Sequence, residues 1–143
     1  MKKFITLNKY GELYIDKILF ETYFPIIFTC KNENNDIFIC VCCQCNENGC
    51  KWLVGRTNGS FIVRMLQNEI TIRQLLLDCC TEKISVDYKN QEYAIAYNNS
   101  DWNEESDYLP KKDAYIDAEG GEFDEEIAYF TSIEHVEYNE EYY

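Results

Sequence analysis

The sequence is poor in histidine, proline and glycine. Its 143 residues include two prolines, six glycines and one histidine, His135, which lies among glutamates that would keep it protonated. A catalytic cysteine needs a neutral base, usually histidine, so this placement argues against a thiol enzyme. The sequence has no G-x-S-x-G, Walker A or G-x-G-x-x-G pattern, and residues 55–60 lack the lysine and glycine spacing of a phosphate loop. We therefore expect no enzyme activity, no catalytic residue and no cofactor.

Long apolar runs are also missing. No stretch approaches the roughly 20 apolar residues that a membrane-spanning helix needs. The N-terminal apolar run stops at Asn8 and Lys9, too early for the hydrophobic part of a signal peptide. We expect a soluble, cytoplasmic protein that does not contact a membrane.

Basic side chains are scarce in the last third of the chain. Residues 1–100 hold 11 acidic and 11 basic side chains, which cancel. Residues 101–143 hold 15 acidic side chains against Lys111 and Lys112, and so account for the whole formal net charge of −13. Nucleic acids and anionic membranes are bound through Lys and Arg, so direct binding to either is disfavoured. The charge instead favours a basic protein partner.

The chain nevertheless has the material for a folded core, because 46% of its residues are apolar and 15% are aromatic. Its length is typical of one domain. We divide it into a charge-neutral core, residues 1–100, and an acidic, aromatic-rich extension, residues 101–143, that packs on the core or continues it.

Apolar runs separated by turn residues predict six strands, over residues 13–20, 25–30, 37–45, 50–55, 83–88 and 92–97. Ser60 is expected to cap a short helix, and Thr71 with Gln74 forms a capping box for a second helix. Beyond Ser100 we expect irregular structure, then a strand or short helix across residues 126–136. These elements predict an α+β fold: a mostly antiparallel sheet of meander and hairpins, with two short helices packed on one side.

Eight cysteines are interpreted first as reduced, buried, small apolar residues, because thiols stay reduced in the cytoplasm. The alternative is a zinc site, for which Cys42, Cys45 and Cys50 have suitable spacing but the vicinal pair 79–80 makes a poor second half. Residues 115–126 partly match a calcium loop, but a tyrosine stands where the first carboxylate is needed. We assign no metal ligand.

The acidic extension contains many large apolar side chains, which a purely solvated tail does not need. Tyrosine and tryptophan are enriched at protein interfaces, so we expect a partner-binding surface here. Its charge is assigned to Glu122, Asp124, Glu125, Glu126, Glu134 and Glu137. Its aromatic anchors are assigned to Trp102, Tyr129, Phe130 and Tyr138.

Three short runs, Phe28–Glu33 (F-T-x-x-N-E), Trp52–Val54 and Ile70–Arg73 (I-x-x-R), resemble a family of small uncharacterised bacterial proteins over residues 13–80. That family offers no catalytic residues to transfer. The acidic extension is similar in kind to phage anti-CRISPR proteins, several of which place carboxylates where a nucleic-acid phosphate would lie. This likeness implies an inhibitor of a nucleic-acid-binding enzyme.

Two other functions fit the same residues. A bacterial immunity protein or antitoxin would neutralise a basic toxin through the same charge. An enzyme or small-molecule-binding domain would instead use a pocket within residues 1–100.

Overall fold

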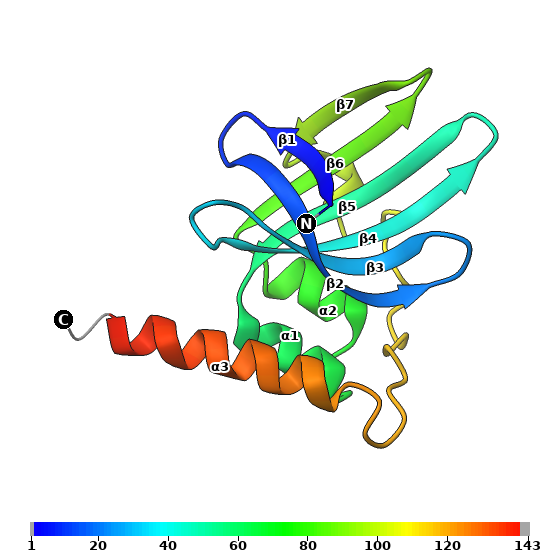
Figure 1. Cartoon of the computed structure of the whole chain (residues 1–143). Helices are drawn as coiled ribbons and strands as arrows, with labels where there is room; N and C mark the ends of the chain where they lie inside the picture. The colour runs from blue at the N-terminus through cyan, green and yellow to red at the C-terminus, as the bar shows by residue number, and fades with distance from the viewer. Residues whose placement is uncertain (1, 141–143) are drawn as a thin grey trace.

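The computed structural model describes residues 2–140, and the side chains of residues 2–133. Seven strands form one antiparallel sheet in which each strand pairs with its neighbours in chain order (Figure 1). The strands are β1 (Lys3–Leu7), β2 (Gly11–Glu21), β3 (Pro25–Lys31), β4 (Ile37–Asn46), β5 (Gly49–Thr57), β6 (Glu82–Lys89) and β7 (Glu92–Tyr97). The helices are α1 (Gly59–Leu66), α2 (Ile72–Asp78) and α3 (Asp124–Glu140), with a 3-10 turn η1 (Ser100–Trp102).

The sheet curls until it is nearly closed, so it is barrel-like rather than a simple meander (Figure 1). Register shifts in the β1–β2, β2–β3 and β4–β5 pairs provide the bulges that bend and twist strands. The expected α+β class, with a mostly antiparallel sheet, is confirmed. The curvature is the difference, and alternating apolar patterns do not encode it.

Each face of the curved sheet carries its own apolar core. On the inner face, Phe38 and Cys40 of β4 join a cluster that also contains Phe28 and Val54. On the outer face, Ile39 of the same strand joins a larger cluster that includes the buried sides of α1 and α2. This strand is apolar on both faces because both faces are covered. No helix within residues 2–140 has the length and apolarity needed to cross a membrane.

The two helices between β5 and β6 begin at side-chain caps. Thr71 and Gln74 form the predicted capping box, with Gln74 N donating to Thr71 Oγ1 at 3.0 Å and Thr71 N donating to Gln74 Oε1 at 2.8 Å. The prediction that Ser60 caps α1 is wrong. Asn58 is the cap, since its Oδ1 accepts from Phe61 N at 3.1 Å, and Ser60 is already inside the helix.

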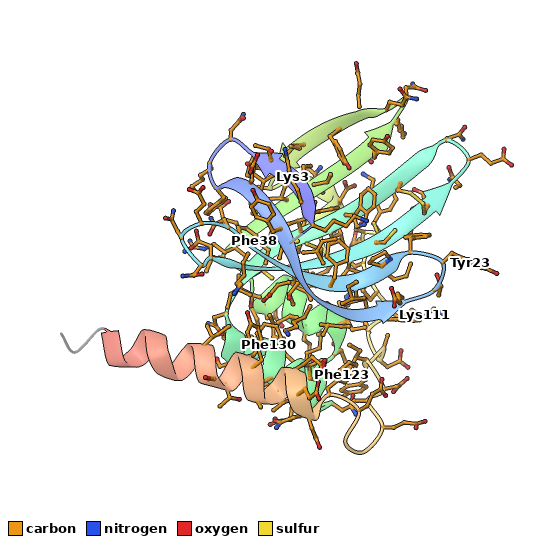
Figure 2. The ribbon with its side chains drawn as sticks, in the orientation of Figure 1. Lys3, Tyr23, Phe38, Lys111, Phe123 and Phe130 are labelled. Atoms are coloured by element: carbon orange, nitrogen blue, oxygen red, sulfur yellow. A yellow bond between two sulfur atoms is a disulfide. The ribbon has the colours of Figure 1, made fainter. Side chains whose placement is uncertain are left out.

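Two elements differ from the sequence-based prediction. The pattern did not predict β1, a strand of five residues. The strand or short helix expected over residues 126–136 is part of α3, a helix of 17 residues. Figures 1 and 2 show α3 extending along the layer of α1 and α2, on the side of the molecule away from β7.

Candidate functional site

We call residues 103–125, from the end of η1 into the first turn of α3, the acidic segment; it holds most of the exposed acidic residues whose side chains the structure describes. It runs from η1 past α2 to the start of α3 (Figure 1). Leu109 and Phe123 are each 7% exposed and belong to the same core cluster as α1 and α2. The segment is therefore irregular in secondary structure but fixed by its apolar side chains.

Trp102, just before the segment, packs against the outer face of the sheet. A Cβ atom at Gly55 would lie 3.3 Å from the Trp102 ring and 2.5 Å from Cys80 Sγ. The glycine in β5 thus leaves room for both side chains. Trp102 is 5% exposed as a result.

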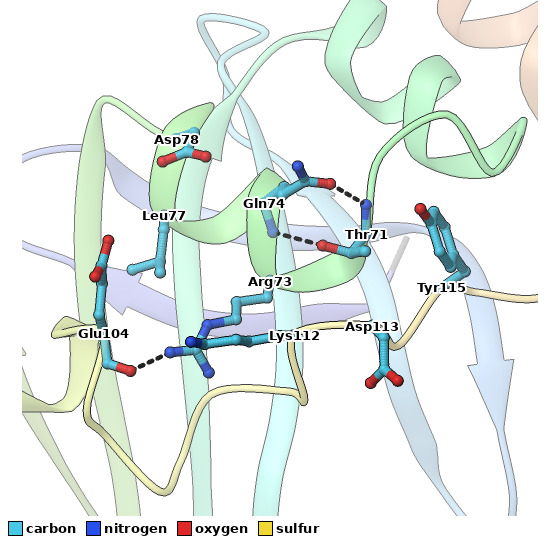
Figure 3. A pocket seen from close by; sticks show the side chains of 9 residues that line it. All are labelled: Thr71, Arg73, Gln74, Leu77, Asp78, Glu104, Lys112, Asp113 and Tyr115. Atoms are coloured by element: carbon cyan, nitrogen blue, oxygen red, sulfur yellow. Dashed lines mark hydrogen bonds between the residues drawn. The ribbon is translucent and has the colours of Figure 1, made fainter.

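Arg73 of α2 holds the first half of the acidic segment. Its guanidinium donates to the backbone oxygen of Glu104 (Figure 3). It also donates to the backbone oxygen of Pro110, at 3.2 Å. A planar guanidinium can make both bonds at once because its N–H groups are fixed in a fork. Arg73 therefore has a positioning role.

Backbone contacts fix the second half of the segment. Ile72 N donates to Ala114 O at 3.1 Å. Asn68, in the loop after α1, donates to Ala118 O at 3.2 Å and accepts from Ala118 N at 3.3 Å. Together with Arg73, these contacts hold the segment's backbone against the helix layer.

A cavity of about 410 Å³ lies between α2 and the acidic segment (Figure 3). Its charged lining is mixed in sign: Arg73, Lys112, Asp78, Glu104 and Asp113. Neither a cysteine nor a histidine lines it. The Arg73 guanidinium in this lining is already bonded to two backbone oxygens.

The acidic residues of the acidic segment are exposed, including Glu104 and Asp113, which also line the cavity. Those classed as exposed are Glu104, Glu105, Asp107, Asp113, Asp117, Glu119, Glu122, Asp124 and Glu125. The ion pairs found among the described side chains use other carboxylates, in β2, in β6, at Asp36 and at Asp101. Within that part of the chain, the segment's charges are thus not neutralised by a neighbouring Lys or Arg.

Two of the expected aromatic anchors lie in the core instead. Phe130 is 0% exposed and Trp102 is 5% exposed, so neither ring offers surface to a partner. Each packs where the extension meets the outer face of the sheet and α1. We drop both from the candidate surface.

Tyr129 is half-buried and connects α3 to the sheet. Its Oη accepts from Lys31 Nζ at 2.7 Å and donates to Asp16 Oδ2 at 2.6 Å. Burial and the bond to Asp16 raise the pKa of Tyr129 well above its usual range. Lys17 Nζ lies 4.5 Å from the centre of its ring. This ring is thus occupied with holding α3, and Tyr138, the remaining expected anchor, has a side chain outside the described residues.

The expected charged residues fall into three groups. Glu122, Asp124 and Glu125 are exposed, as a binding surface requires. Glu126 is half-buried and, with Asp124 and Glu125, lies in the first turn of α3, where negative charge also stabilises the helix. The side chains of Glu134 and Glu137 lie outside the described residues, as does that of His135.

Sequence reasoning missed the acidic side chains earlier in the segment. Asp107, Asp113 and Asp117 are exposed, and apolar residues that face the core, Leu109 and Ile116, alternate with them. The alternation of apolar and acidic residues in the sequence could have revealed these exposed carboxylates, because a disordered acidic tail needs no apolar residues between its charges.

The cysteines differ from expectation at one pair. Cys45 and Cys50 lie opposite each other in the β4–β5 hairpin with a Cα–Cα distance of 4.0 Å, and the structure joins them as a disulfide where the sequence predicts free thiols. The other six are free. Burial raises the pKa of the Cys43 and Cys80 thiols to about 12, which suits small apolar residues rather than nucleophiles.

A zinc site would require the thiol of Cys42 to lie next to those of Cys45 and Cys50. Cys45 and Cys50 are bonded to each other, and Cys42 Sγ lies 3.7 Å from the backbone oxygen of Gln44. Among the side chains of residues 2–133, no group of three potential metal ligands is gathered.

No protein family model matches this chain, and no match to it is found among curated proteins or solved structures. The resemblance of residues 13–80 to small bacterial proteins, and the likeness of the extension to anti-CRISPR proteins, therefore stay predictions. The function must be argued from the site itself.

Proposed function

We propose that this protein is a non-catalytic binding protein that presents the acidic segment to a basic protein partner. The observation that carries the proposal is the pairing of two properties in one segment. Its carboxylates are exposed and have no ion pair within the described residues. Its apolar residues Leu109 and Phe123 are buried in the core, and Ile116 packs against that core. A solvated tail would have the first property and not the second.

A fixed acidic segment suits binding for two physical reasons. Negative charge concentrated on one region steers a basic partner during diffusion and raises the association rate. Because the backbone is already held by Arg73 and Asn68, binding does not have to order it, and that entropic cost is avoided.

The partner we favour is a protein whose basic groove normally holds nucleic acid. The exposed carboxylates do not form one compact cluster but recur along an extended chain, from Glu104 to Glu125. A nucleic-acid backbone presents negative charge in the same serial manner. Occupying such a groove would make the protein an inhibitor, of the anti-defence kind that its composition resembles.

The test uses a triple variant, Asp107→Asn, Asp113→Asn and Glu122→Gln, which removes three exposed charges from the acidic segment. The matched control, Glu21→Gln, Glu33→Gln and Glu47→Gln, removes three exposed charges elsewhere and leaves the same net charge. Each protein is immobilised and exposed to a bacterial lysate at low salt, then eluted with a salt gradient. Duplex DNA serves as a competitor in parallel.

We expect the unaltered chain and the control to retain a basic nucleic-acid-binding protein that salt and DNA displace. The segment variant should lose at least tenfold in affinity, because each exposed contact to a basic groove contributes on the order of 0.5–1 kcal/mol. Equal retention by the two variants, or affinity unchanged by salt, would contradict the proposal. A retained partner that DNA does not displace would point to a basic toxin instead.

A further inference from the structure

The last strand, β7, forms one of the two edges at which the nearly closed sheet ends. All six of its residues are exposed, and among the described strands it pairs only with β6. Tyr93, Ile95 and Tyr97 are 47%, 36% and 38% exposed, respectively. An apolar edge strand of this kind is a template for pairing with another chain.

The ladder between β6 and β7 shows which backbone groups face outward. Asn98 N donates to Lys83 O at 2.9 Å, just beyond the strand. Hydrogen-bonded and non-hydrogen-bonded pairs alternate in an antiparallel ladder, so the next residue, Tyr97, is not bonded to β6. By the same alternation, the N–H and C=O groups of Tyr97, Ile95 and Tyr93 point toward the open edge.

The sequence of this strand reads the same in both directions. Residues 93–97 are Tyr-Ala-Ile-Ala-Tyr, centred on Ile95. In antiparallel pairing of two copies about that centre, Ile95 lies opposite Ile95 of the second copy and Tyr93 lies opposite Tyr97. These are the residues whose backbone groups face outward, so the pairing adds about six hydrogen bonds with no change of register.

The other edge strand lacks these properties. β1 contains Lys3 and has a register shift between Lys3 and Ile5. Lysine and bulges are devices that prevent edge-to-edge association. In β7 the ladder is regular and the only charged residue is Glu92, at its first position.

The distribution of charge also permits this contact. α3 and the later part of the acidic segment, which leads into it, lie on the side of the molecule away from β7 (Figure 1). Two copies joined at β7 would therefore keep their most negative regions far apart. At that distance salt screens most of the remaining repulsion.

We propose that two copies of this chain associate through β7, in an antiparallel pairing centred on Ile95 that joins their sheets across a two-fold axis. Such an interface is isologous, with the same strand contributed by each copy. Tyr93 and Tyr97 of opposite copies stack side by side on one face of the joined sheet. The acidic segments remain open at the two outer ends.

The mass in solution tests the pairing, measured by light scattering after gel filtration over a series of concentrations. The unaltered chain should reach twice the 17.0 kDa of one chain. Ile95→Lys should keep the mass of one chain, because a lysine there places like charges opposite each other. Ile18→Lys is the control: Ile18 is also exposed, but it lies in a part of β2 interrupted by register shifts and outside the proposed contact, so the dimer should persist.

Amide hydrogen exchange provides a test that needs no variant. The outward amides of Tyr93, Ile95 and Tyr97 should become protected as concentration rises, while the inward amides of Ala94 and Ala96 are protected throughout. A mass of one chain at every concentration, or exchange of the Ile95 amide that concentration leaves unchanged, would overturn the pairing. Added salt screens charge, so it should strengthen the dimer, whose two chains repel each other, and weaken the binding of a basic partner. The dimer and the basic partner can therefore be tested separately.

Discussion

Lys51 joins the acidic extension to the sheet. Its Nζ lies 2.8 Å from Asp101 Oδ2 and 3.2 Å from Asp87 Oδ1, and its side chain is 13% exposed. Burial opposes the charge of Lys51, but the hydrogen bonds to Asp101 and Asp87 outweigh it and raise its pKa. Burial likewise opposes the charge of Asp101, but the bond from Lys51 outweighs it and lowers the pKa of that carboxyl below 3.8.

Replacing Lys51 by methionine should destabilise the fold by about 2 kcal/mol, because two partly buried carboxylates lose their cation. The control is Lys111→Met, since Lys111 is exposed and makes no ion pair within the described residues. Urea unfolding at neutral pH measures both. Equal midpoints for K51M and K111M would contradict the assignment.

The ion pair between Lys51 and Asp101 should stabilise the fold only over a limited range of pH. Asp101 has a lower pKa in the folded chain than in the unfolded one, so its contribution is full above the ordinary value of 3.8 and is lost as pH falls through the lowered one. Lys51 has a raised pKa, so its contribution is full below 10.5 and is lost as pH rises through the raised one. The difference in stability between the unaltered chain and K51M should therefore be largest between these limits.

At this scale the sequence reveals residue types but not their surroundings. Trp102 and Phe130 both stand among carboxylates, which made them candidate interface anchors. What places them in the core is a pair of glycines distant in sequence, Gly55 and Gly59, against which they pack. No local pattern around either aromatic residue carries that information.

Among the elements, α3 depends on a close approach to α1. A Cβ atom at Gly59 would lie 2.6 Å from the backbone oxygen of Phe130. A backbone atom cannot turn aside as a flexible side chain can, so any larger residue must push the two helices apart.

Gly59→Ala should consequently destabilise the protein by about 1–2 kcal/mol, through overpacking at this contact. A loss of stability would be informative, because replacing glycine by alanine inside a helix normally stabilises the helix by up to about 1 kcal/mol. Gly120→Ala is the control: nothing lies within 4 Å of its Cβ position, and its effect should stay within about 0.5 kcal/mol. Thermal unfolding of the two variants measures the difference, and a stabilised Gly59→Ala protein would show that α3 is not held in this way.

Element prediction succeeded where local chemistry decides the outcome. The β6–β7 hairpin has a two-residue turn, Asn90 and Gln91, whose positive φ angles match the predicted turn chemistry. α3 was harder to predict because carboxylates occur along much of its sequence, although among its described side chains Ile127, Tyr129, Phe130 and Ile133 pack against the core. β1 was missed because it has only five residues, and because its apolar residues were considered as part of a signal peptide.

For the whole molecule, the boundary of charge at Ser100 is not a boundary of packing. One core cluster unites side chains from α1, α2 and the outer face of the sheet with Trp102, Leu109, Phe123 and Phe130 of the extension. The neutral part therefore leaves a large apolar face uncovered when it is alone. The charge split can be counted in the sequence itself, but how the two parts pack depends on contacts between residues far apart in sequence.

This shared core predicts that residues 1–100 do not fold stably alone, and that residues 101–143 supplied as a separate chain restore them. Burying the four large side chains offsets the cost of association, because each contributes about 1.5–3 kcal/mol when removed from water. Coexpression of the two fragments should give a complex that copurifies, with the far-ultraviolet circular dichroism of the intact chain. Phe130→Ala in the second fragment should abolish copurification, whereas Glu105→Gln, an exposed change in the same fragment, should not. If residues 1–100 alone were monomeric and as stable as the intact chain, the acidic extension would be a dispensable tail. The acidic segment would then not be held rigidly by the core, and the proposed binding surface would lose its support.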